Sequence, residues 1–468
     1  MGKATGFLEY ARSENPFRDA DARLKDYHDL HFPQSPEVRY VQAARCMDCG
    51  VPFCQSDFGC PLHNLIPEWN DLLCQGMERE ALARLLQTAP FPEFTGRVCP
   101  ALCEKACNLA DDGVTNRDNE LYLIETGFSK GWMHPRIPAI RSGKKIAVIG
   151  SGPAGLSAAD YLNQAGHTVT VIERDDRPGG LLMYGIPNMK LPKTIVERRI
   201  RLMEAEGIAF QLSTEADPVL LTSYDAVLLC CGSRKPRSLP VEHLDAKGVF
   251  YAVSYLKEAT RGILAGASPS VTAQGKHVVV VGGGDTGNDC VGTALRQGAA
   301  FVTQLEMMPQ APSVRLSSNP WPEWPRILRT DYGQQEAIAR QGCDPRFYET
   351  TVKSIQVNAA NQVCAIQTVR LAMSPERRPV PVPGSEQILP CDLLLIAAGF
   401  TGCEEETPAR FLITPDHRGR CMPSDGSHYL GGKLFSAGDM RTGQSLVVRA
   451  LADGRAAGKE ISQWLMVQ

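Results

Sequence analysis

Residues 145–173, KIAVIGSGPAGLSAADYLNQAGHTVTVIE, constrain the fold of this chain more than any other stretch. An apolar run at 146–149 is typical of a buried parallel strand, and Gly150, Gly152 and Gly155 follow it at G-x-G-x-x-G spacing. A helical pattern and a second apolar strand complete the stretch. This order of elements predicts a βαβ unit that binds a dinucleotide.

Each glycine of the motif has a separate role. The first permits a tight turn, the second lets a pyrophosphate approach the backbone, and the third lets the helix pack closely on the strand. The helix begins at about Pro153, and its free amide groups and positive end favour phosphate. Glu173 ends the second strand, where a carboxylate accepts hydrogen bonds from a ribose 2′-hydroxyl.

The same pattern recurs at residues 276–306, where Gly282, Gly284 and Gly287 follow a valine-rich strand and Glu306 ends the next strand. Internal repetition of this kind indicates a duplicated unit. Two dinucleotide sites imply two cofactors, and hydride transfer between them is the simplest reason for both.

Three further segments complete the two predicted units. Residues 225–232 and 392–399 each read as Asp, an apolar run and Gly, which predicts the closing strand of each unit. Residues 434–439, LFSAGD, predict a strand that ends in Gly-Asp, and residues 442–461 predict a helix. The first turn of that helix would direct amide groups at a bound flavin ring and stabilise negative charge on it.

The cysteines give the second strong signal. Of the 16 cysteines, seven form two tight groups, with the spacings C-x2-C-x4-C-x5-C-P and C-P-x2-C-x3-C; they are Cys46, Cys49, Cys54, Cys60, Cys99, Cys103 and Cys107. In a reducing compartment such groups indicate metal ligands before disulfides. Cysteine followed by proline is typical of iron–sulfur sites. Zinc sites and purely structural thiols remain the alternatives.

The residues before about 140 otherwise look helical. Residues 67–86 carry leucines at helical spacing and predict one amphipathic helix. Cys74 lies within it, and we interpret it as a buried cysteine, with a role as an eighth ligand as the alternative. Residues 132–141 are interrupted by proline and predict a linker.

Composition excludes several classes of partner. The 468 residues carry a net charge of −3, which gives no indication of a nucleic-acid or membrane-surface partner. No apolar run approaches the ~18 residues of a membrane span, and the N-terminal sequence lacks the apolar core of a signal peptide. We therefore expect a cytoplasmic protein with two to four domains.

Seven motifs together carry a family resemblance over nearly the whole chain. They are CMDCGVPFC, GCPLHNLIPEWNDL, GRVCPALCEKAC, VIGSGPAGLSAA, GGLLMYGIPNMKLPK, VVVVGGGDTGNDCVGTALRQGA and LFSAGDMRTGQSLVVRAL. In these motifs the chain resembles the small (beta) subunit family of glutamate synthase. The same modules occur in the N-terminal half of dihydropyrimidine dehydrogenase and in ferredoxin-dependent NADP reductases of the same type.

The resemblance implies an α/β fold in which an N-terminal α-helical iron–sulfur domain precedes two doubly wound dinucleotide-binding domains. We expect the iron–sulfur domain at residues 1–143, the FAD domain at 144–255 plus 405–468, and the NAD(P)H domain at 256–404. FAD is implied at the first glycine motif and the Gly-Asp strand, and the nicotinamide nucleotide at the second motif. The cofactor-binding residues that we expect are Gly150, Gly152, Pro153, Ala154, Gly155, Glu173, Arg174, Gly180, Leu181, Gly232, Gly282, Gly284, Asp285, Thr286, Gly287, Glu306, Gly399, Gly438, Asp439, Ser445 and Leu446.

The resemblance also implies two [4Fe-4S] clusters with crossed ligands. One set is Cys46, Cys49, Cys54 and Cys107, and the other is Cys60, Cys99 and Cys103 with Glu125 as a fourth, non-cysteine ligand. The segment between Cys107 and Glu125 is longer than the family pattern. Residues 183–190, MYGIPNMK, are expected along the isoalloxazine ring. The loop at 319–325, NPWPEWP, resembles the corresponding region of NADH-type enzymes.

Glu306 bears on the choice of nucleotide. A carboxylate at the end of that strand suits a free 2′-hydroxyl and repels a 2′-phosphate, so the sequence favours NADH over NADPH. The alternative is that Glu306 faces solvent while Arg296 or Arg315 binds a phosphate.

The inferred reaction is hydride transfer from the nicotinamide to FAD, followed by single-electron transfer to the clusters. We expect no catalytic acid or base, because hydride transfer needs none. The chain has no N-terminal nucleophilic cysteine, so a separate large (alpha) subunit is the expected electron acceptor and the site of L-glutamate formation from glutamine and 2-oxoglutarate. The alternatives are a stand-alone reductase of a ferredoxin-type carrier and a docking subunit that carries clusters without being an enzyme.

Overall fold

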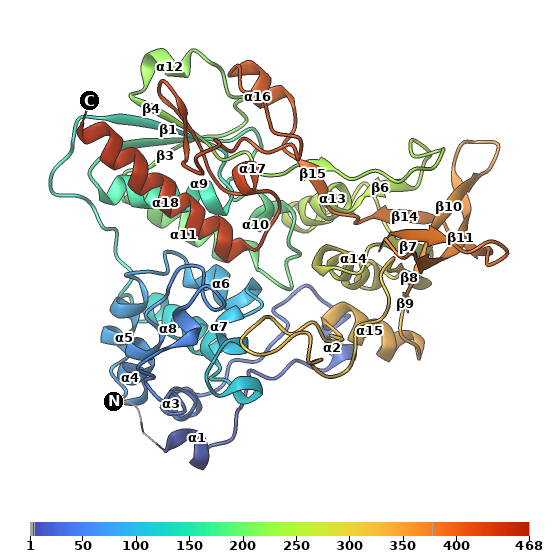
Figure 1. Ribbon diagram of the computed structural model, residues 1–468, viewed down its shortest axis with the longest axis horizontal. Helices are drawn as coiled ribbons and strands as arrows, with labels where there is room; N and C mark the ends of the chain where they lie inside the picture. The colour runs from blue at the N-terminus through green and yellow to red at the C-terminus, as the bar shows by residue number, and fades with distance from the viewer. Residues whose placement is uncertain (1–2, 4, 377, 468) are drawn as a thin grey trace.

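The computed structural model describes residue 3, residues 5–376 and residues 378–467. It contains three units (Figure 1): N-terminal helices, a first parallel sheet above them, and a second parallel sheet with an antiparallel arm to the right. The α/β fold, with a helical N-terminal unit and two doubly wound units, confirms the expected fold class. No helix in these ranges is long and apolar enough to cross a membrane.

The N-terminal unit is helical, as the sequence predicts. Its residues are held together by a cluster that includes Trp69, Leu73, Leu85 and Leu123, all inaccessible to solvent. The helices are α1 (Gly6–Glu9), α2 (Ala20–Arg23), α3 (Pro36–Ala44), α4 (Ile66–Cys74), α5 (Glu78–Leu85), α6 (Pro92–Val98), α7 (Leu102–Lys105) and α8 (Asn116–Ser129), with 3-10 turns at Phe53–Gln55 and Ala110–Asp112.

The single helix expected at residues 67–86 is wrong. The segment forms two helices, α4 and α5, because Gly76 between them adopts a φ of +75°, which ends the first helix. Cys74 lies in the last turn of α4, where its Sγ contacts the Asp71 carbonyl at 3.1 Å. It is partly buried and packs against the hydrophobic cluster of the N-terminal unit.

The first sheet has the strand order β16-β17-β4-β1-β2-β3. All neighbours are parallel except β16, which is antiparallel to β17. The strands are β1 (Lys145–Ile149), β2 (Thr168–Ile172), β3 (Ala209–Gln211), β4 (Ala226–Leu229), β16 (Tyr429–Gly431) and β17 (Leu434–Ser436), and the helices of this unit are α9 (Pro153–Gln164), α10 (Leu181–Tyr184), α11 (Lys193–Ala205), α12 (Leu220–Ser223), α16 (Glu406–Arg410), α17 (Asp439–Thr442) and α18 (Val447–Met466).

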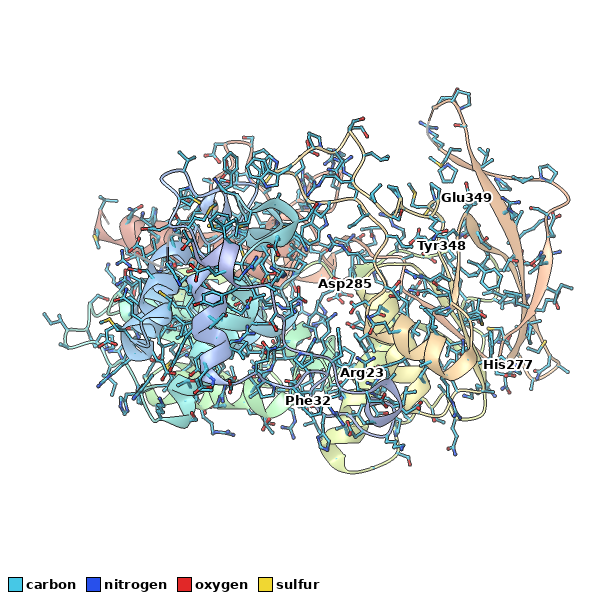
Figure 2. The ribbon with its side chains drawn as sticks, turned by 90° about the horizontal axis from the view of Figure 1, so that it is seen from below. Arg23, Phe32, His277, Asp285, Tyr348 and Glu349 are labelled. Carbon is cyan, nitrogen blue, oxygen red and sulfur yellow. The ribbon has the colours of Figure 1, made fainter. Side chains whose placement is uncertain are left out.

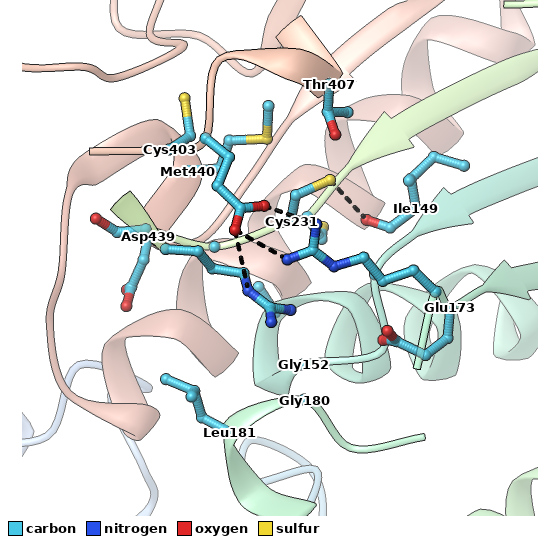
Figure 3. Close-up of a pocket in the computed structure, with 18 of the residues that line it drawn as sticks. Ile149, Gly152, Glu173, Gly180, Leu181, Cys231, Cys403, Thr407, Asp439 and Met440 are labelled. Carbon is cyan, nitrogen blue, oxygen red and sulfur yellow. Dashed lines mark hydrogen bonds and ion pairs between the residues drawn. The ribbon is translucent and has the colours of Figure 1, made fainter. Parts of the chain in front are cut away.

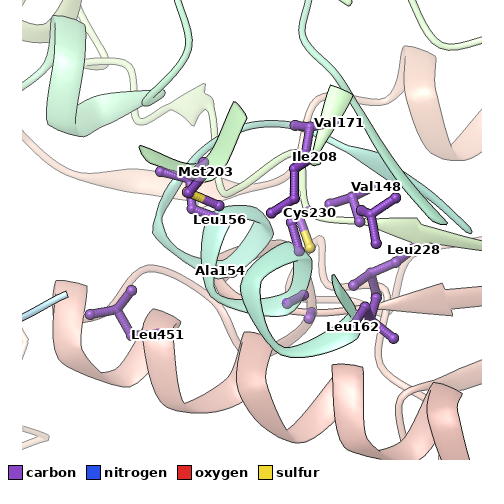
Figure 4. Packing of buried hydrophobic residues seen from close by; sticks show 14 of the residues in the cluster. Val148, Ala154, Leu156, Leu162, Val171, Met203, Ile208, Leu228, Cys230 and Leu451 are labelled. Atoms are coloured by element: carbon purple, nitrogen blue, oxygen red, sulfur yellow. The ribbon is translucent and has the colours of Figure 1, made fainter. Parts of the chain in front are cut away.

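Helices α9 and α18 pack on one face of this sheet (Figure 4). Val148, Leu228, Leu156, Leu162 and Leu451 form part of one buried cluster there, all with no exposed surface. Burial of each such side chain stabilises the fold by about 1.5–3 kcal/mol. The sheet therefore has a solid apolar layer behind it, and its carboxyl edge is fixed relative to the two helices.

The second sheet has the order β6-β14-β7-β8-β9 and is parallel throughout. It repeats the first: strand, glycine turn, helix and strand, with a closing strand beside the first one. Its elements are β6 (Val249–Tyr251), β7 (His277–Val281), β8 (Phe301–Leu305), β9 (Arg346–Phe347), β14 (Leu393–Ile396), α13 (Ala252–Ala265), α14 (Asp285–Arg296) and α15 (Tyr332–Gln341); the antiparallel arm comprises β10 (Thr350–Val357), β11 (Val363–Met373), β12 (Pro379–Pro381) and β13 (Gln387–Pro390).

The chain passes between the two sheets twice, and the two crossings pair with each other. The short strands β5 (Lys235–Pro236) and β15 (Phe400–Gly402) are antiparallel. The expected boundary at residue 255 lies beyond this crossing, inside α13. Because β6 pairs with β14, residues 249–251 belong to the second sheet, and that unit begins earlier than expected.

The N-terminal unit also reaches the second sheet through the segment that contains α2. Arg23 on α2 lies beside α15 (Figure 2), where its Nε is 3.0 Å from Glu336 Oε1. Arg296 on α14 donates from Nε to the Asp26 carbonyl at 3.0 Å. The linker expected at 132–141 has no helix or strand, but Arg136 holds it to the first sheet unit through Glu206.

Candidate functional site

A long pocket lies at the carboxyl edge of the first sheet (Figure 3), where parallel α/β sheets bind their ligands. The free space within it is about 1300 Å³, a volume that includes the part open to solvent. Twelve of the expected cofactor residues line it: Gly150, Gly152, Pro153, Ala154, Glu173, Arg174, Gly180, Leu181, Gly232, Asp439, Ser445 and Leu446.

The three glycines of the first motif have three different surroundings. Gly150 has a φ of +100°, and a Cβ there would be 2.6 Å from the Cys230 carbonyl oxygen. At Gly152 a Cβ would meet nothing within 4 Å, so this position faces open space. At Gly155 a Cβ would be 1.9 Å from the Gly150 oxygen. The turn, the free approach and the close packing expected from the sequence are therefore all present.

Glu173 is buried at the end of β2, and its carboxylate is fixed in place. It accepts hydrogen bonds from the Ser151 N–H at 3.0 Å, the Ser151 hydroxyl at 2.6 Å and the Asp175 N–H at 2.9 Å. A carboxylate has about four acceptor positions, so it keeps acceptor capacity toward the pocket. This geometry suits a ribose hydroxyl.

The Gly-Asp strand ends at the other side of the pocket. Gly438 has a φ of +71° and donates its N–H to Asp453 Oδ2 at 2.7 Å, while Asp439 accepts a hydrogen bond from the Ser445 hydroxyl at 3.0 Å. Burial raises the pKa of Asp439. The helix expected from residue 442 begins at Val447, so Leu446, Val447 and Ala450 around the first turn of α18 line the pocket.

The sequence analysis missed several polar residues of this pocket. Arg234 and Lys257 line it, and Lys257 is paired with Asp175, next to the predicted Arg174. Arg174 pairs with Glu404 at 2.7 Å. Arg234 follows Gly232 closely and was within reach of a motif-based prediction. Lys257 lies on α13, which carries no motif.

The second glycine motif has the same construction at the carboxyl edge of the second sheet. Gly282 has a φ of +129°, Gly284 faces open space, and at Gly287 a Cβ would be 2.1 Å from the Gly282 oxygen. Asp285 and Thr286 form the first turn of α14. The expected residue Gly399 lies apart from them, at the crossing between the units, with a φ of +83° beside the Gln444 side chain.

Glu306 lies against the turn of this second motif. A Cβ on Gly283 would be 2.0 Å from Glu306 Oε2, and Glu306 Oε1 accepts the Met308 N–H at 2.8 Å. The two arginines of the alternative interpretation are engaged elsewhere. Arg296 is paired with Glu336 at 2.6 Å and is almost fully buried, and Arg315 donates to the Glu323 carbonyl at 2.7 Å.

The N-terminal unit contains a cavity whose lining includes four cysteines from two distant segments of the sequence: Cys46, Cys49, Cys54 and Cys107. Burial and the neighbouring Cys107 and Cys49 thiols raise the pKa of Cys46 to about 12. Burial and the Cys46 thiol likewise raise the pKa of Cys54. The thiols surround a space; among the described residues, no three Cys, His, Asp or Glu side chains converge closely enough to hold a single metal ion.

Cys60, Cys99 and Cys103 form the second group. Burial and the Cys60 and Cys99 thiols raise the pKa of Cys103 well above its usual value, so the three thiols are near neighbours. Burial raises the pKa of Cys60 to about 11, with a contribution from the Glu120 carboxylate, which also raises the pKa of Cys99. The two groups adjoin each other, because the Cys60 N–H donates to the Cys54 carbonyl at 2.9 Å.

The structure does not support Glu125 as the carboxylate of the second group. Glu125 is held by Arg97 at 2.9 Å and by Arg198 at 2.8 Å, and it is one third exposed. Glu120, about one and a half turns earlier on α8, is the carboxylate of this helix whose charge raises the pKa of Cys60 and Cys99. Burial raises the pKa of Glu120 to about 8, and Glu120 accepts a hydrogen bond from the Thr95 hydroxyl.

The pocket and the cysteine groups are joined by apolar packing. Leu446 lines the pocket and also packs against the hydrophobic cluster that contains Cys54, Cys60 and the buried Val448. The first sheet unit and the N-terminal unit thus share a contact surface at Leu446, a residue that lines the pocket.

This combination of two glycine-motif sheets and a cysteine-rich helical unit defines a nicotinamide-nucleotide and flavin oxidoreductase that carries iron–sulfur chemistry. Residues 144–318 match the family described as pyridine nucleotide-disulphide oxidoreductase, and residues 23–132 match dihydropyrimidine dehydrogenase domain II, 4Fe-4S cluster. NADPH-bound FprA from Mycobacterium tuberculosis has a similar fold, with a TM-score of 0.52 at 19% identity over 69% of this chain and 85% of that one.

Two relatives are similar over the full length of this chain. The glutamate synthase [NADPH] small chain of Bacillus subtilis is 46% identical over 100% of this chain and 99% of that protein. The glutamate synthase [NADH] of Saccharomyces cerevisiae is 44% identical over 99% of this chain, which corresponds to 22% of that longer protein. The chain belongs to the family of glutamate synthase small chains and is an NAD(P)H-dependent oxidoreductase.

Proposed function

We propose that this chain is the electron-input subunit of a glutamate synthase. It oxidises NADH in preference to NADPH, holds FAD and two [4Fe-4S] clusters, and passes electrons to a large subunit that makes L-glutamate from glutamine and 2-oxoglutarate. The single observation that carries the proposal is the continuity of the pocket beside the first glycine motif with two adjoining cysteine groups through Leu446 and Val448.

FAD is the proposed occupant of the pocket. The open position at Gly152 and the amide end of α9 support a pyrophosphate there, and the fixed carboxylate of Glu173 supports a ribose. Leu181, Tyr184 and Lys257 line the same pocket as Asp439 and Ser445. A flavin accepts a hydride from a nicotinamide and gives electrons singly to iron–sulfur clusters. The protein's part is to hold it beside the second glycine motif and the cysteines.

The segment at 183–190 is proposed to lie along the ring. Met183 and Met189 are buried, and Lys190 leaves the first unit and reaches α14, where its Nζ is 3.1 Å from Asp289 Oδ1. Tyr332 on α15 donates to the same Asp289 oxygen at 2.9 Å. These contacts support a positioning role, because they tie the flavin unit to the helix that begins at the nucleotide motif.

We propose that each cluster takes ligands from both cysteine-rich segments, as the resemblance implies, and that one ligand differs from the expected set. Cys46, Cys49, Cys54 and Cys107 are the ligands of the first cluster, and their shared cavity supports this set. Cys60, Cys99 and Cys103 are ligands of the second, with Glu120 as the fourth in place of Glu125. The proposed units are the helical unit to about residue 143, the flavin unit of the first sheet, and the nucleotide unit between the two crossings.

NADH is the proposed preferred donor. Glu306 at the second motif suits a 2′-hydroxyl and repels a 2′-phosphate, and Arg296 and Arg315 are engaged in other contacts. The relatives are named for NADPH in one case and for NADH in the other, so the choice within the family varies.

An anaerobic titration of the purified chain with NADH and then NADPH, with assays of FAD, iron and sulfide, tests the proposal. We expect FAD, about eight irons and flavin bleaching at lower NADH than NADPH concentration. Addition of the large subunit should then make NADH oxidation depend on glutamine and 2-oxoglutarate. Zinc in place of iron, or no flavin, contradicts the proposal. Full turnover with ferredoxin and none with the large subunit favours the stand-alone reductase, and flavin without any NADH oxidation favours the docking subunit.

A further inference from the structure

The loop at residues 319–325 belongs to the nucleotide unit in sequence but touches the N-terminal unit in space. It lies between β8 and α15, and its Trp321 donates from the indole Nε1 to the Cys107 carbonyl oxygen at 3.0 Å. The Trp321 ring also packs against the Phe53 ring, with 4.8 Å between centroids. A tryptophan of one unit therefore contacts the first cysteine group of another.

The loop is internally braced, so the position of Trp321 is well defined. Asn319 is almost fully buried and donates from Nδ2 to the Trp324 carbonyl at 3.1 Å, and its Oδ1 accepts the Arg326 N–H at 2.8 Å. Arg315 donates to the Glu323 carbonyl at 2.7 Å. These bonds close the loop on itself independently of the contact with the cysteines.

Trp321 lies where the two segments that supply the first group meet. Phe53 is adjacent to Cys54, and Cys107 comes from the other segment. Asn108 joins them: it donates from Nδ2 to the Val51 carbonyl at 3.3 Å and accepts the Phe53 N–H at 3.3 Å. Trp321 adds a hydrogen bond to one segment and ring packing to the other.

We propose that Trp321 is a positioning residue for the first cluster, supplied by the nucleotide unit. It holds Cys107 against the segment of residues 46–54 and keeps water from that side of the cavity. This inference rests on the proposed function, because it takes Cys46, Cys49, Cys54 and Cys107 as cluster ligands.

The proposal has two physical consequences. Reduction adds negative charge to a cluster held by four thiolates, and water stabilises that charge, so exclusion of water lowers the reduction potential. A ligand held by a neighbouring hydrogen bond is also lost less readily. Removal of the indole should therefore raise the potential of one cluster and speed the release of its iron.

The test compares Trp321→Ala, Trp321→Phe and the control Trp324→Phe in the full chain, purified without oxygen. Trp324 is in the same loop, but its ring packs on Arg329, 3.8 Å from the centroid. The measurements are iron and sulfide content, an EPR redox titration that resolves the two clusters, and the rate of iron release to a chelator. Flavin bleaching by NADH reports whether the rest of the chain is intact.

For Trp321→Ala we expect a raised potential of one cluster and about tenfold faster release of half of the iron, with normal flavin bleaching. Trp321→Phe keeps the ring but loses the N–H, so it should release iron at an intermediate rate. Trp324→Phe should match the wild type. If Trp321→Ala does not fold, Trp321→Phe decides. Unchanged potential and iron release in the folded Trp321 variants overturn the inference, whereas a wild-type chain without two clusters overturns the proposed function itself.

Discussion

Glu120 and Glu125 point to different sides of helix α8, because five residues turn an α-helix by about 140°. The charge of Glu120 raises the pKa of the Cys60 and Cys99 thiols, whereas Glu125 is paired with Arg97 and Arg198. We expect Glu120→Ala to lose the iron of one cluster, from about eight irons to about four, while Glu125→Ala keeps both clusters. Iron and sulfide assays with an FAD assay as the folding control distinguish the two. Iron loss in Glu125→Ala alone would make Glu125 the ligand after all.

The sequence was least informative about the fourth, non-cysteine ligand of the second cysteine group. Two glutamates lie in the same helical stretch after Cys107, and the pattern of residues does not show which face of the helix meets the cysteines. The excess length before Glu125 was the one available signal, since Glu120 shortens that segment by five residues. The cysteines themselves were identifiable, because seven thiols in two tight groups indicate metal ligands in a reducing compartment.

Glu306 allows a direct test of nucleotide choice. Its carboxylate lies at the turn of the second glycine motif, so Glu306→Gln should remove charge repulsion toward a 2′-phosphate and weaken hydrogen bonding to a 2′-hydroxyl. We expect kcat/KM for NADH to fall about tenfold or more and the NADPH to NADH ratio to rise. Glu349→Gln, near the same Met308 backbone, is the control. If Glu306→Gln leaves kcat/KM unchanged for both NADH and NADPH, Glu306 does not contact the nucleotide.

Two glycines of the first motif have different roles in the elements around them. Gly155 is needed for the packing of α9, and Gly152 for the approach of the cofactor. Gly155 must lack a side chain because a Cβ there would be 1.9 Å from the Gly150 oxygen, whereas Gly152 has free space. We expect Gly155→Ala to destabilise the packing of α9 on β1 by about 1–3 kcal/mol. Gly152→Ala should leave the stability of the flavin-free protein within about 0.5 kcal/mol but reduce its FAD content. Denaturation curves and FAD assays check both; normal FAD content in Gly152→Ala would contradict the pyrophosphate assignment.

A partly buried charge network joins His428, directly before the edge strand β16, to helix α18 next to the Gly-Asp turn. His428 contacts Glu460 through Nδ1 at 2.7 Å and Asp453 through Nε2 at 3.3 Å, and Arg441 pairs with Asp453 at 2.8 Å. Burial opposes protonation of His428, but its bonds to Asp453 and Glu460 prevail and raise its pKa above the ordinary 6.5.

This shift predicts a pH dependence of stability. Because the folded-state pKa of His428 is raised, its contribution is complete below pH 6.5 and is lost as the pH rises through the folded-state pKa. His428→Gln should therefore reduce the unfolding free energy more at pH 6 than at pH 9. Chemical denaturation at both pH values measures this, with the exposed linker variant His134→Gln as control. An equal loss at the two pH values would mean that His428 is neutral in the folded chain.

Elements with strong local signals were predictable, and elements set by long-range pairing were not. The strands β1 and β7 are buried after their first residue, and each is an apolar run directly before a glycine motif; β2 and β8, with the same burial, follow the helix of each motif. Strand β6 has no such signal, and it joins the second sheet because β14 pairs with it. The break between α4 and α5 depends on the backbone of Gly76, which helical periodicity does not report.

Two separate contacts join the helical unit to the nucleotide unit. In one, α2 of the helical unit reaches α14 and α15; in the other, the loop at 319–325 of the nucleotide unit reaches the helical unit. The helical unit sends Arg23 into the nucleotide unit, and the nucleotide unit sends Trp321 to the helical unit. Two contacts in opposite directions hold both units in one arrangement. The same arrangement then fixes the distance from the flavin pocket to the cysteine groups and the distance from that pocket to the second glycine motif.

Glu336 is the centre of the first contact and provides its test. It is fully buried between Arg23 and Arg296, whose side chains are only 2% and 1% exposed. Glu336→Gln leaves two buried guanidinium groups without a counter-charge, so we expect a loss of about 3–5 kcal/mol in unfolding free energy and tryptic cleavage near Arg23. Glu386→Gln breaks the exposed pair with Lys353 and should cost less than about 1 kcal/mol. If Glu336→Gln matches Glu386→Gln in both stability and cleavage, the α2 contact does not fix the units. If Glu336→Gln is less stable and more readily cleaved than Glu386→Gln but keeps its flavin, the glycine-motif folds are intact. The arrangement of the units then depends on the Glu336 carboxylate.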